Sequence, residues 1–272
     1  MQILTLNINS IRAHAQCLLS TIRELNPDVI LLQELKCTDE QFPHILFEHL
    51  GYNIKTFGQK SWNGVAVMSK FSIEDVSRGF PGTEDMGARM IEAVIDGRIR
   101  IINVYMPNGE SEDSPKFRVK LDWMRAFTKH IAPYLHSEEP VIIAGDINVA
   151  IEDRDVWSPE QYRGSSISAE AAREIMREWL GVSPAPLGAG GSRSETGGGW
   201  IDCYRHFHPN KNDAWTWIGY RGGSIEKNRG LRLDYFLANH AARPLLKNCD
   251  ITIVPRTTEK PTDHLGVLLE IK

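Results

Sequence analysis

Several polar side chains that can bind a cation or move a proton stand directly after short apolar runs of the sequence. Their positions are Asn7 after 3–6, Glu34 after 29–32, Tyr105 after 101–104, and Asp146 and Asn148 after 141–144. Two further groups adjoin apolar runs late in the chain, Asp234 within 231–238 and Asp263-His264 before 265–271. Because a strand holds its terminal side chains rigidly while loops admit a substrate, we expect these groups to form one site at a sheet edge.

These residue types fit the hydrolysis of a phosphodiester. That reaction needs a hard cation, a deprotonated water and hydrogen-bond donors for the phosphoryl oxygens. The carboxylate of Glu34 and the other Asp and Asn side chains are oxygen ligands of the kind that Mg²⁺ takes. His264 can accept the proton of the water while Asp234 fixes its ring. The remaining candidate partners of phosphate or water are Asn7, Tyr105 and Asn148.

Each of these residues taken alone has a simpler interpretation. A carboxylate at a strand end is usually a solvated turn residue, and a histidine beside an aspartate is often a surface pair. The sequence contains no Cys-x-x-Cys, no phosphate-binding glycine loop and no Gly-x-Ser-x-Gly motif that would indicate another chemistry. The coincidence of several such groups therefore favours a site, and nothing in it predicts covalent catalysis by Ser or Cys.

The composition is that of a globular protein without a strong overall charge. The 272 residues allow one large domain or two small ones. A hydrophobic content of 42% with 24% charged residues excludes wholesale disorder, collagen and coiled coil. The 31 Lys and Arg against 35 Asp and Glu give a formal net charge of −4. Any nucleic acid must therefore bind through a local basic face.

The chain has the features of a protein that works in the cytoplasm. No apolar run approaches the roughly 18 residues that a membrane helix needs. The N-terminus lacks the charged segment and the cleavage site of an export signal. The cysteines are far apart in the sequence and predict buried thiols in a reducing compartment: Cys17, Cys37, Cys203 and Cys249.

Short apolar runs that alternate with amphipathic stretches predict an α/β protein. The expected strands are 1–6, 28–32, 63–68, 90–95, 99–105, 141–144, 214–218, 231–238, 249–254 and 265–271. The expected helices are 10–25 with Ser10 as N-cap, one capped by Asp39, one from Ser114-Pro115 to Leu135, and 168–180. Residues 181–199 contain seven of the 22 glycines and predict a surface loop inserted in a single domain, 1–272.

In order along the chain, these motifs resemble the exonuclease III family of class II apurinic/apyrimidinic endonucleases, within the endonuclease/exonuclease/phosphatase superfamily. The matching blocks are TLNINSIRA (5–13), PDVILLQELK (27–36), WNGVAVMSK (62–70), NVYMPNGE (103–110), GDINVA (145–150), WTW (215–217), NRGLRLDYFLAN (228–239) and PTDHLGV (261–267). The combination of GDxN with a later RxDY and DH is specific, and the blocks span nearly the whole chain.

The resemblance implies a four-layered α/β sandwich of two mixed β-sheets flanked by helices. It implies that Glu34 is the principal metal ligand, that Asp146 and Asn148 position the attacking water, and that Tyr105 is the active-site tyrosine. His264 and Asp234 match the family's His–Asp pair, and the general base is either Asp146 or His264. The candidate ligands of Mg²⁺, or of Mn²⁺ in its place, are then Asn7, Glu34, Asp146, Asn148, Asp263 and His264.

The resemblance also implies contacts with DNA. Arg89 and Asn108 match positions that contact the DNA strand. Three residues fall where the family has an apolar pocket for a flipped-out, base-less sugar, although they could equally belong to the core: Trp217, Leu231 and Leu233. Four basic residues form either a solvated face or a set of phosphate contacts: Arg221, Lys227, Arg229 and Arg232.

The expected activity is that of a Mg²⁺-dependent DNA-repair phosphodiesterase. Such an enzyme cleaves double-stranded DNA 5′ to abasic sites and trims blocked or ordinary 3′ ends. Residues 151–168 and 181–199 match the family poorly, which leaves open a paralogue specialised for 3′-end trimming as 3′-phosphatase and exonuclease. A lipid or inositol phosphatase and a silent DNA-binding module are disfavoured. We expect a monomer, because abasic DNA has no two-fold symmetry.

Overall fold

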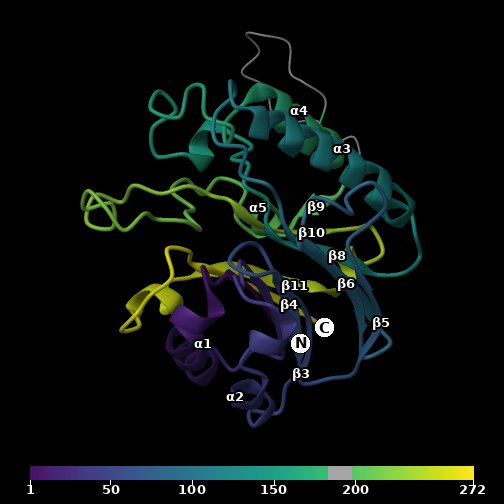
Figure 1. Cartoon of the computed structure of the whole chain (residues 1–272). Coiled ribbons are helices and arrows are strands. Elements are labelled where there is room, and N and C mark those ends of the chain that lie inside the picture. Colours follow the sequence, from purple (N-terminus) through teal and green to yellow (C-terminus); the bar gives the residue numbers. More distant parts are fainter. Residues whose placement is uncertain (183–197) are drawn as a thin grey trace.

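The computed structural model describes residues 1–182 and 198–272, and these residues contain two six-stranded sheets stacked face to face (Figure 1). The first sheet contains, in spatial order, β11 (Leu246–Thr252), β12 (Gly266–Ile271), β1 (Gln2–Asn7), β2 (Val29–Gln33), β4 (Val65–Ser69) and β3 (Asn53–Phe57). The second contains β5 (Ile73–Arg78), β6 (Met90–Ile95), β7 (Ile99–Tyr105), β8 (Val141–Asp146), β10 (Asp234–Ala238) and β9 (Ile201–Asp202). Both sheets are mixed, because β1–β2 and β7–β8 are parallel pairs.

Helices cover the outer faces of both sheets and complete four layers (Figure 1). The helices are α1 (Ile11–Leu25) and α2 (His44–Glu48) beside the first sheet, α3 (Pro115–Leu135) and α4 (Glu170–Trp179) beside the second, and the short α5 (Cys203–Phe207). Ser10 accepts a hydrogen bond from the Ala13 amide, and Ser114 caps α3 ahead of Pro115, as the sequence predicts. The expected four-layered α/β sandwich is confirmed.

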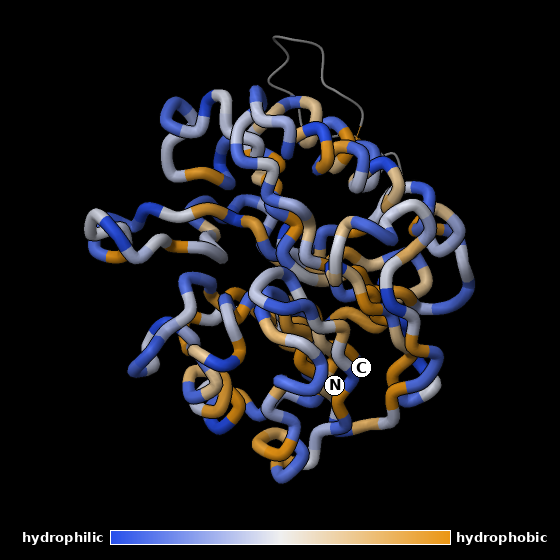
Figure 2. The backbone as a smooth tube through the Cα atoms, in the orientation of Figure 1, coloured by the Kyte–Doolittle hydropathy of each residue, from blue (hydrophilic) through white to orange (hydrophobic). Residues whose placement is uncertain are grey.

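Three apolar layers hold the sandwich together, and each central strand contributes to two of them. In β8, Val141 and Ile143 face the layer under α3 and α4, whereas Ile142 and Ala144 face the other sheet. Successive side chains of a strand point to opposite faces, so a strand buried on both sides becomes a continuous apolar run. Hydrophobic segments accordingly lie along the interior strands in Figure 2, while the projecting loops are mostly hydrophilic.

The strand ends that carry the polar residues meet because of the strand order. Asn7 is paired in register with Gln33 at the end of β2, and Tyr105 with Asp146 at the end of β8. Antiparallel β10 begins at Asp234, which lies opposite Asp146. The stacking of the two sheets then brings both groups of residues to one edge of the sandwich.

The strands that the sequence pattern missed lie at sheet edges. These are β3, β5 and β9, and the remaining edge strand β11 begins three residues earlier than the expected 249–254. An edge strand is partly exposed and does not need a continuous apolar run, so its hydrophobic signal is weak. In β5, for example, no residue is buried.

Three other expected elements differ in detail. The helix capped by Asp39 is a 3₁₀ turn (Asp39–Gln41) followed by α2, because Pro43 interrupts it. The expected strand 214–218 forms only isolated bridges through Trp217, and strand 231–238 is reduced to β10. Most of the expected loop 181–199 lies outside the described residues. The four cysteines are buried and unpaired, as predicted.

Candidate active site

The amide of Asn7 joins carboxylates from the two sheets. Its Nδ2 donates to Oε1 of Glu34 at 2.8 Å and to Oδ2 of Asp146 at 2.9 Å. Asn7 and Asp146 are buried, whereas Glu34 is partly exposed. Because Glu34 follows a strand of the first sheet and Asp146 ends a strand of the second, the hydrogen bonds of Asn7 span the interface between the sheets.

His264 is held by a second carboxylate of the same site. Its Nδ1 lies 2.9 Å from Oδ2 of Asp234, and its Nε2 lies 3.9 Å from Oδ2 of Asp146. Asp234 is itself positioned by Thr216, whose hydroxyl oxygen accepts the Asp234 amide at 3.0 Å. The Asp234 contact places the proton of the ring on Nδ1 in the neutral form and turns Nε2 towards Asp146.

Burial and crowded charges shift the pKa values of this pair. Burial raises the pKa of Asp146 to about 7, and the negative charge of Asp234 adds to the effect. Burial alone would lower the pKa of His264, but the charge and hydrogen bond of Asp234, with Asp146, raise it to about 10. Several buried carboxylates therefore lie close together and repel one another, because few positive charges are nearby. A bound cation would reduce this repulsion.

The donor set fits a hard divalent cation. One ligand atom from each of Glu34, Asp146 and His264 lies within 4.8 Å of the other two, and this is the single such group of His, Cys, Asp and Glu in the described part of the chain. Oδ1 of Asp234 is buried nearby and has no hydrogen-bond partner among the described residues. The two carboxylates offer the oxygen ligands that suit Mg²⁺ or Mn²⁺, whereas a metal that prefers thiolates would need cysteine at the site.

The other expected metal ligands lie next to this group and have partners of their own. Asp263 accepts one hydrogen bond from Nδ2 of Asn9 and one from Nε1 of Trp217, both at 3.0 Å. Oδ1 of Asn148 accepts a hydrogen bond from Nδ2 of Asn108 at 3.0 Å, and Nδ2 of Asn148 donates one to the carbonyl of Met106. The structure therefore brings Asp263 and Asn148 beside the site but outside the three-residue group.

Tyr105 and Arg89 form one wall of the site. The guanidinium of Arg89 lies 5.0 Å from the centre of the Tyr105 ring and donates to the Tyr105 carbonyl at 3.3 Å. Burial raises the pKa of Tyr105 well above its usual value, and the charge of Glu34 adds to this effect. The Tyr105 hydroxyl therefore keeps its proton at neutral pH and is available as a donor.

Sequence patterns missed three residues that organise the site. Lys36 pairs with Oε2 of Glu34 at 2.8 Å and donates to Oδ1 of Asn9 at 2.5 Å. Lys120 of α3 is buried and donates to the backbone carbonyls of Asn108, Asn148 and Ser166. Lys36 and Asn9 lie two positions after Glu34 and Asn7 within matched blocks, a signal that could have identified them, whereas Lys120 lies in an ordinary amphipathic helix.

Glu34 has a backbone conformation that few side chains adopt. Its φ is +54°, and φ is +53° at Lys36 and +54° at Asn148. Left-handed conformations at residues other than glycine cost of order 1 kcal/mol or more each and tend to persist at functional sites. The two turns thus direct the side chains of Glu34 and Asn148 at some cost in backbone strain.

Residues expected to contact DNA lie on loops around this site. The 218–230 arm projects on the same side of the molecule as segments 157–164 and 256–262 (Figure 1). The amide of Trp157 donates to the Gly230 carbonyl at 3.1 Å, and the Tyr220 hydroxyl donates to the Pro261 carbonyl at 2.9 Å. The arm is therefore joined to both neighbouring loops.

The expected DNA contacts differ in exposure. Arg221 is exposed on the arm, whereas the guanidinium of Arg229 lies 4.4 Å from the centre of the Trp157 ring. Trp217 is half-buried, and Leu231 and Leu233 expose only 1% and 3% of their surface in an apolar cluster with Ala150 and Val156. Trp217 is thus the accessible part of this apolar surface, and the two buried leucines belong to the cluster against which it packs.

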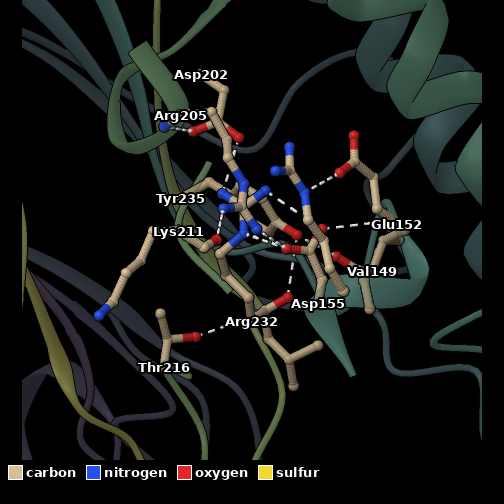
Figure 3. A network of polar contacts seen from close by, with 12 residues as sticks. Val149, Glu152, Asp155, Asp202, Arg205, Lys211, Thr216, Arg232 and Tyr235 are labelled. Carbon is tan, nitrogen blue, oxygen red and sulfur yellow. Dashed lines mark hydrogen bonds and ion pairs between the residues drawn. The ribbon is translucent and has the colours of Figure 1, made fainter. Parts of the chain in front are cut away.

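Arg232 is not part of a solvated basic face, and the structure corrects that interpretation. It is buried, and its guanidinium pairs with Asp155 at 2.8 Å and with Asp202 at 2.8 Å (Figure 3). Arg205 pairs with the same Asp155 at 2.5 Å. The two arginines and two aspartates neutralise one another, so this network ties the loop after β8 to the segment that leads into β10.

We expect Asp155→Asn to destabilise the protein by about 3–5 kcal/mol, because two buried guanidinium groups would then share one carboxylate. Urea unfolding followed by circular dichroism measures the loss. Asp153→Asn is the matched control, because Asp153 lies in the same 3₁₀ turn, pairs with Arg173 and is 72% exposed. A loss below about 1 kcal/mol for Asp155→Asn, the range of exposed pairs, would contradict a structural role for the network.

Comparison with known proteins places this geometry among nucleases. The sequence pattern of the endonuclease/exonuclease/phosphatase family matches residues 4–264. Exodeoxyribonuclease III of Haemophilus influenzae is 31% identical over 280 aligned residues, which cover all of both chains. No helix in the described ranges is both long and apolar enough to cross a membrane.

Two solved structures share the whole fold. An AP endonuclease from Archaeoglobus fulgidus has a TM-score of 0.89 and 32% identity, covering 100% of this chain and 99% of the other. A 3′ phosphatase, NExo, from Neisseria bound to a product DNA hairpin has a TM-score of 0.89 and 30% identity, with the same coverage. The two similarities are nearly equal although the two proteins have different named activities.

Proposed function

Because this chain belongs to the endonuclease/exonuclease/phosphatase family, and within it to the exonuclease III group of DNA-repair nucleases, we propose that it hydrolyses phosphodiesters in duplex DNA 5′ to abasic sites and at blocked 3′ ends. The observation that supports this most directly is the hydrogen-bonded set at the sandwich edge. Asn7 bridges Glu34 and Asp146, and Asp234 orients His264 towards Asp146. These groups supply cation ligands, a base and a proton donor within a few ångströms.

We propose that Glu34 and Asp146 hold Mg²⁺, and that Mn²⁺ can substitute; His264, whose Nε2 keeps its proton, lies beside the ion as a hydrogen-bond donor and is not a ligand. When bound, the ion supplies positive charge that lowers the pKa of a coordinated water and offsets charge on the phosphoryl oxygens. The amide of Asn7 keeps the two carboxylates apart and in register. Lys36 pairs with Oε2 of Glu34 and so reduces the negative charge that the carboxylates place at the site.

Among the two candidate bases, we assign the role to Asp146. Nδ1 of His264 is hydrogen-bonded to Asp234, so Nε2 is the nitrogen that faces the site. The raised pKa of His264 keeps Nε2 protonated at neutral pH. A protonated ring donates to a phosphoryl oxygen and does not accept a proton from water. The carboxylate of Asp146, positioned by Asn7 and by the amide of Asn148, then takes the proton.

Loop residues around the site suit a DNA strand. Arg89 and Asn108 lie beside Tyr105 and Asn148, where they can donate to the phosphates that flank the scissile bond. Arg221 on the arm offers a further phosphate contact, and Trp217 offers an apolar face to a base-less sugar. A missing base lowers the cost of turning that sugar out of the helix.

A second activity, preferential trimming of 3′ ends, is supported by one specific observation. The 3′ phosphatase from Neisseria matches the fold as well as the AP endonuclease does, with the same TM-score. The apolar cluster of Leu231 and Leu233 is also nearly closed, so the surface for a flipped sugar is small. The chemistry at the phosphorus is the same in both activities, and only the fit of the DNA differs.

One gel assay separates these activities. A duplex with a single tetrahydrofuran site and a duplex with a 3′-phosphate are each incubated with EDTA, Mg²⁺ or Mn²⁺. We expect both to be cleaved with either ion and neither with EDTA. If incision is more than about a hundredfold slower than phosphate release, a difference of about 2.7 kcal/mol in barrier, the protein is a 3′-end trimming enzyme. Absence of any cleavage with both ions would overturn the proposed function.

We also propose that residues 1–272 act as one domain, as a monomer, in the cytoplasm. The four unpaired, buried cysteines suit a reducing compartment. An abasic site offers no symmetry to a dimer, so one copy is sufficient for binding. Light scattering after size exclusion, with and without the abasic duplex, tests the oligomeric state.

A further inference from the structure

The active site is assembled from two sheets, and their relative position must therefore be fixed to a fraction of an ångström. The first sheet supplies Asn7 and Glu34, and the second supplies Tyr105, Asp146 and Asp234. Between the sheets lies an apolar layer that includes Ile3, Val65 and Ile142. Hydrophobic contact has no preferred direction, so it holds the sheets together without fixing how far one is displaced along the other.

Two buried amides cross this apolar layer. Gln33 of β2 and Asn103 of β7 are both 0% exposed, and Nε2 of Gln33 donates to Oδ1 of Asn103 at 2.7 Å. Nδ2 of Asn103 in turn donates to the carbonyls of Leu32 at 3.0 Å and Ala66 at 2.9 Å. A single side chain of the second sheet thus makes directional contacts with two strands of the first.

The pair stands next to the functional residues along every strand involved. Gln33 directly precedes Glu34 and is the register partner of Asn7. Asn103 lies two positions before Tyr105, and its register partner Ala144 lies two positions before Asp146. Any shift of one sheet against the other at this point therefore changes the separation between Glu34 and Asp146.

Stability alone does not account for the pair. A buried amide costs free energy unless all its hydrogen bonds are made, and an apolar pair of the same size is often at least as stable. Oε1 of Gln33 is buried and has no partner among the described residues. A pair of buried amides, one of them with an unpaired oxygen, thus lies in a layer that is mostly apolar.

We propose that Gln33 and Asn103 are positioning residues that lock the register between the two sheets and thereby set the distance between the two halves of the cation site. This proposal rests on the proposed function for its catalytic consequence. The pair touches neither substrate nor cation, and it acts through Glu34 and Asp146. Its prediction for cation binding can be measured independently of cleavage.

The test uses near-isosteric variants of the full chain. Gln33→Met and Asn103→Leu each remove the cross-sheet bond, and the double variant Gln33→Asn/Asn103→Gln exchanges the two amides while keeping their combined length. Asn239→Leu is the control, because Asn239 is also 0% exposed, and its Nδ2 donates to the carbonyls of Tyr134 and Glu139 at the far end of β10 from Asp234. Measurements are kcat and KM on the abasic duplex, Mn²⁺ affinity by electron paramagnetic resonance, and urea unfolding.

We expect Asn103→Leu and Gln33→Met to lower kcat about 30-fold or more with KM changed less than about threefold, because small misplacements of reacting groups reduce turnover far more than binding. The Kd for Mn²⁺ should rise about tenfold, a size typical of groups that support metal ligands. The exchanged pair should recover most of both losses. Asn239→Leu should lose comparable stability and keep the wild-type kcat and Mn²⁺ affinity.

Two results would overturn the proposal. One is an Asn103→Leu or Gln33→Met protein whose Kd for Mn²⁺ stays within about threefold of the wild-type value, well short of the expected rise of about tenfold. The other is an Asn239→Leu protein that loses cation affinity as much as they do, which would show a general effect of lost stability. If the wild-type protein cleaves no DNA, the proposed function fails, while the Mn²⁺ titrations still decide the role of the pair.

Discussion

Glu34→Gln is expected to reduce metal-dependent cleavage by about a thousandfold, equivalent to about 4 kcal/mol in barrier, while DNA binding is retained. Glutamine keeps the shape of the side chain and can still accept the hydrogen bond from Asn7, so the fold is preserved. The negative charge is lost, however, and Lys36 at 2.8 Å then places an unbalanced positive charge beside the cation site. Cation affinity should therefore fall together with turnover.

Single-turnover cleavage over a range of Mg²⁺ concentrations measures this effect, with binding followed by fluorescence anisotropy of a labelled duplex in EDTA. Partial recovery at high Mg²⁺ would identify the loss as one of cation binding. Glu48→Gln is the control, because Glu48 is an exposed glutamate of α2 on the outer side of the first sheet. Cleavage by Glu34→Gln within about tenfold of the wild type, only about 1.4 kcal/mol in barrier, would exclude Glu34 as the principal ligand.

Asp234→Asn should lower kcat by about a hundredfold to ten-thousandfold, the range seen when an orienting carboxylate is removed from a histidine. Burial lowers the pKa of His264, and Asp234 is the main group that raises it to about 10. Without that carboxylate the pKa of His264 falls, and near neutral pH the ring loses the Nε2 proton that it donates. The loss should therefore be smaller at low pH, where the ring is protonated again.

The pH profile of kcat separates this role from simple instability, because an unfolding variant loses activity more steeply at low pH. Asp250→Asn is the matched control. Asp250 also pairs with a histidine, since its Oδ1 lies 2.8 Å from Nε2 of His208, but this pair is partly exposed and Asp250 lies in β11, the edge strand of the first sheet. If Asp234→Asn left kcat unchanged at neutral pH, the assignment of His264 as proton donor would be wrong.

Local patterns were sufficient for the strands that carry the site. The runs before Asn7, Glu34, Tyr105 and Asp146 are buried on both faces, and such strands become apolar at most positions. A polar residue at the end of such a run stands out for the same reason. Edge strands such as β3 and β5 lack this contrast, because most of their residues are partly or fully exposed.

Arg232 shows where local patterns fail. Its charge and its basic neighbours favour a solvated face, yet it is buried against Asp155 and Asp202, which lie 77 and 30 positions away in the sequence. A charge becomes tolerable in the interior only when opposite charges from other segments surround it. Nothing in the residues around 232 indicates which segments those are.

The sequence by itself determined which side chains could perform the chemistry and that strands end at them, because burial imposes a periodicity that can be recognised within a few residues. Only the tertiary structure decided which of these groups are neighbours. Asn7 meets Asp146 across 139 positions and Gln33 meets Asn103 across 70, through the stacking of two separate sheets. Such contacts depend on strand order and on the register between sheets, and these are properties of the whole packed chain.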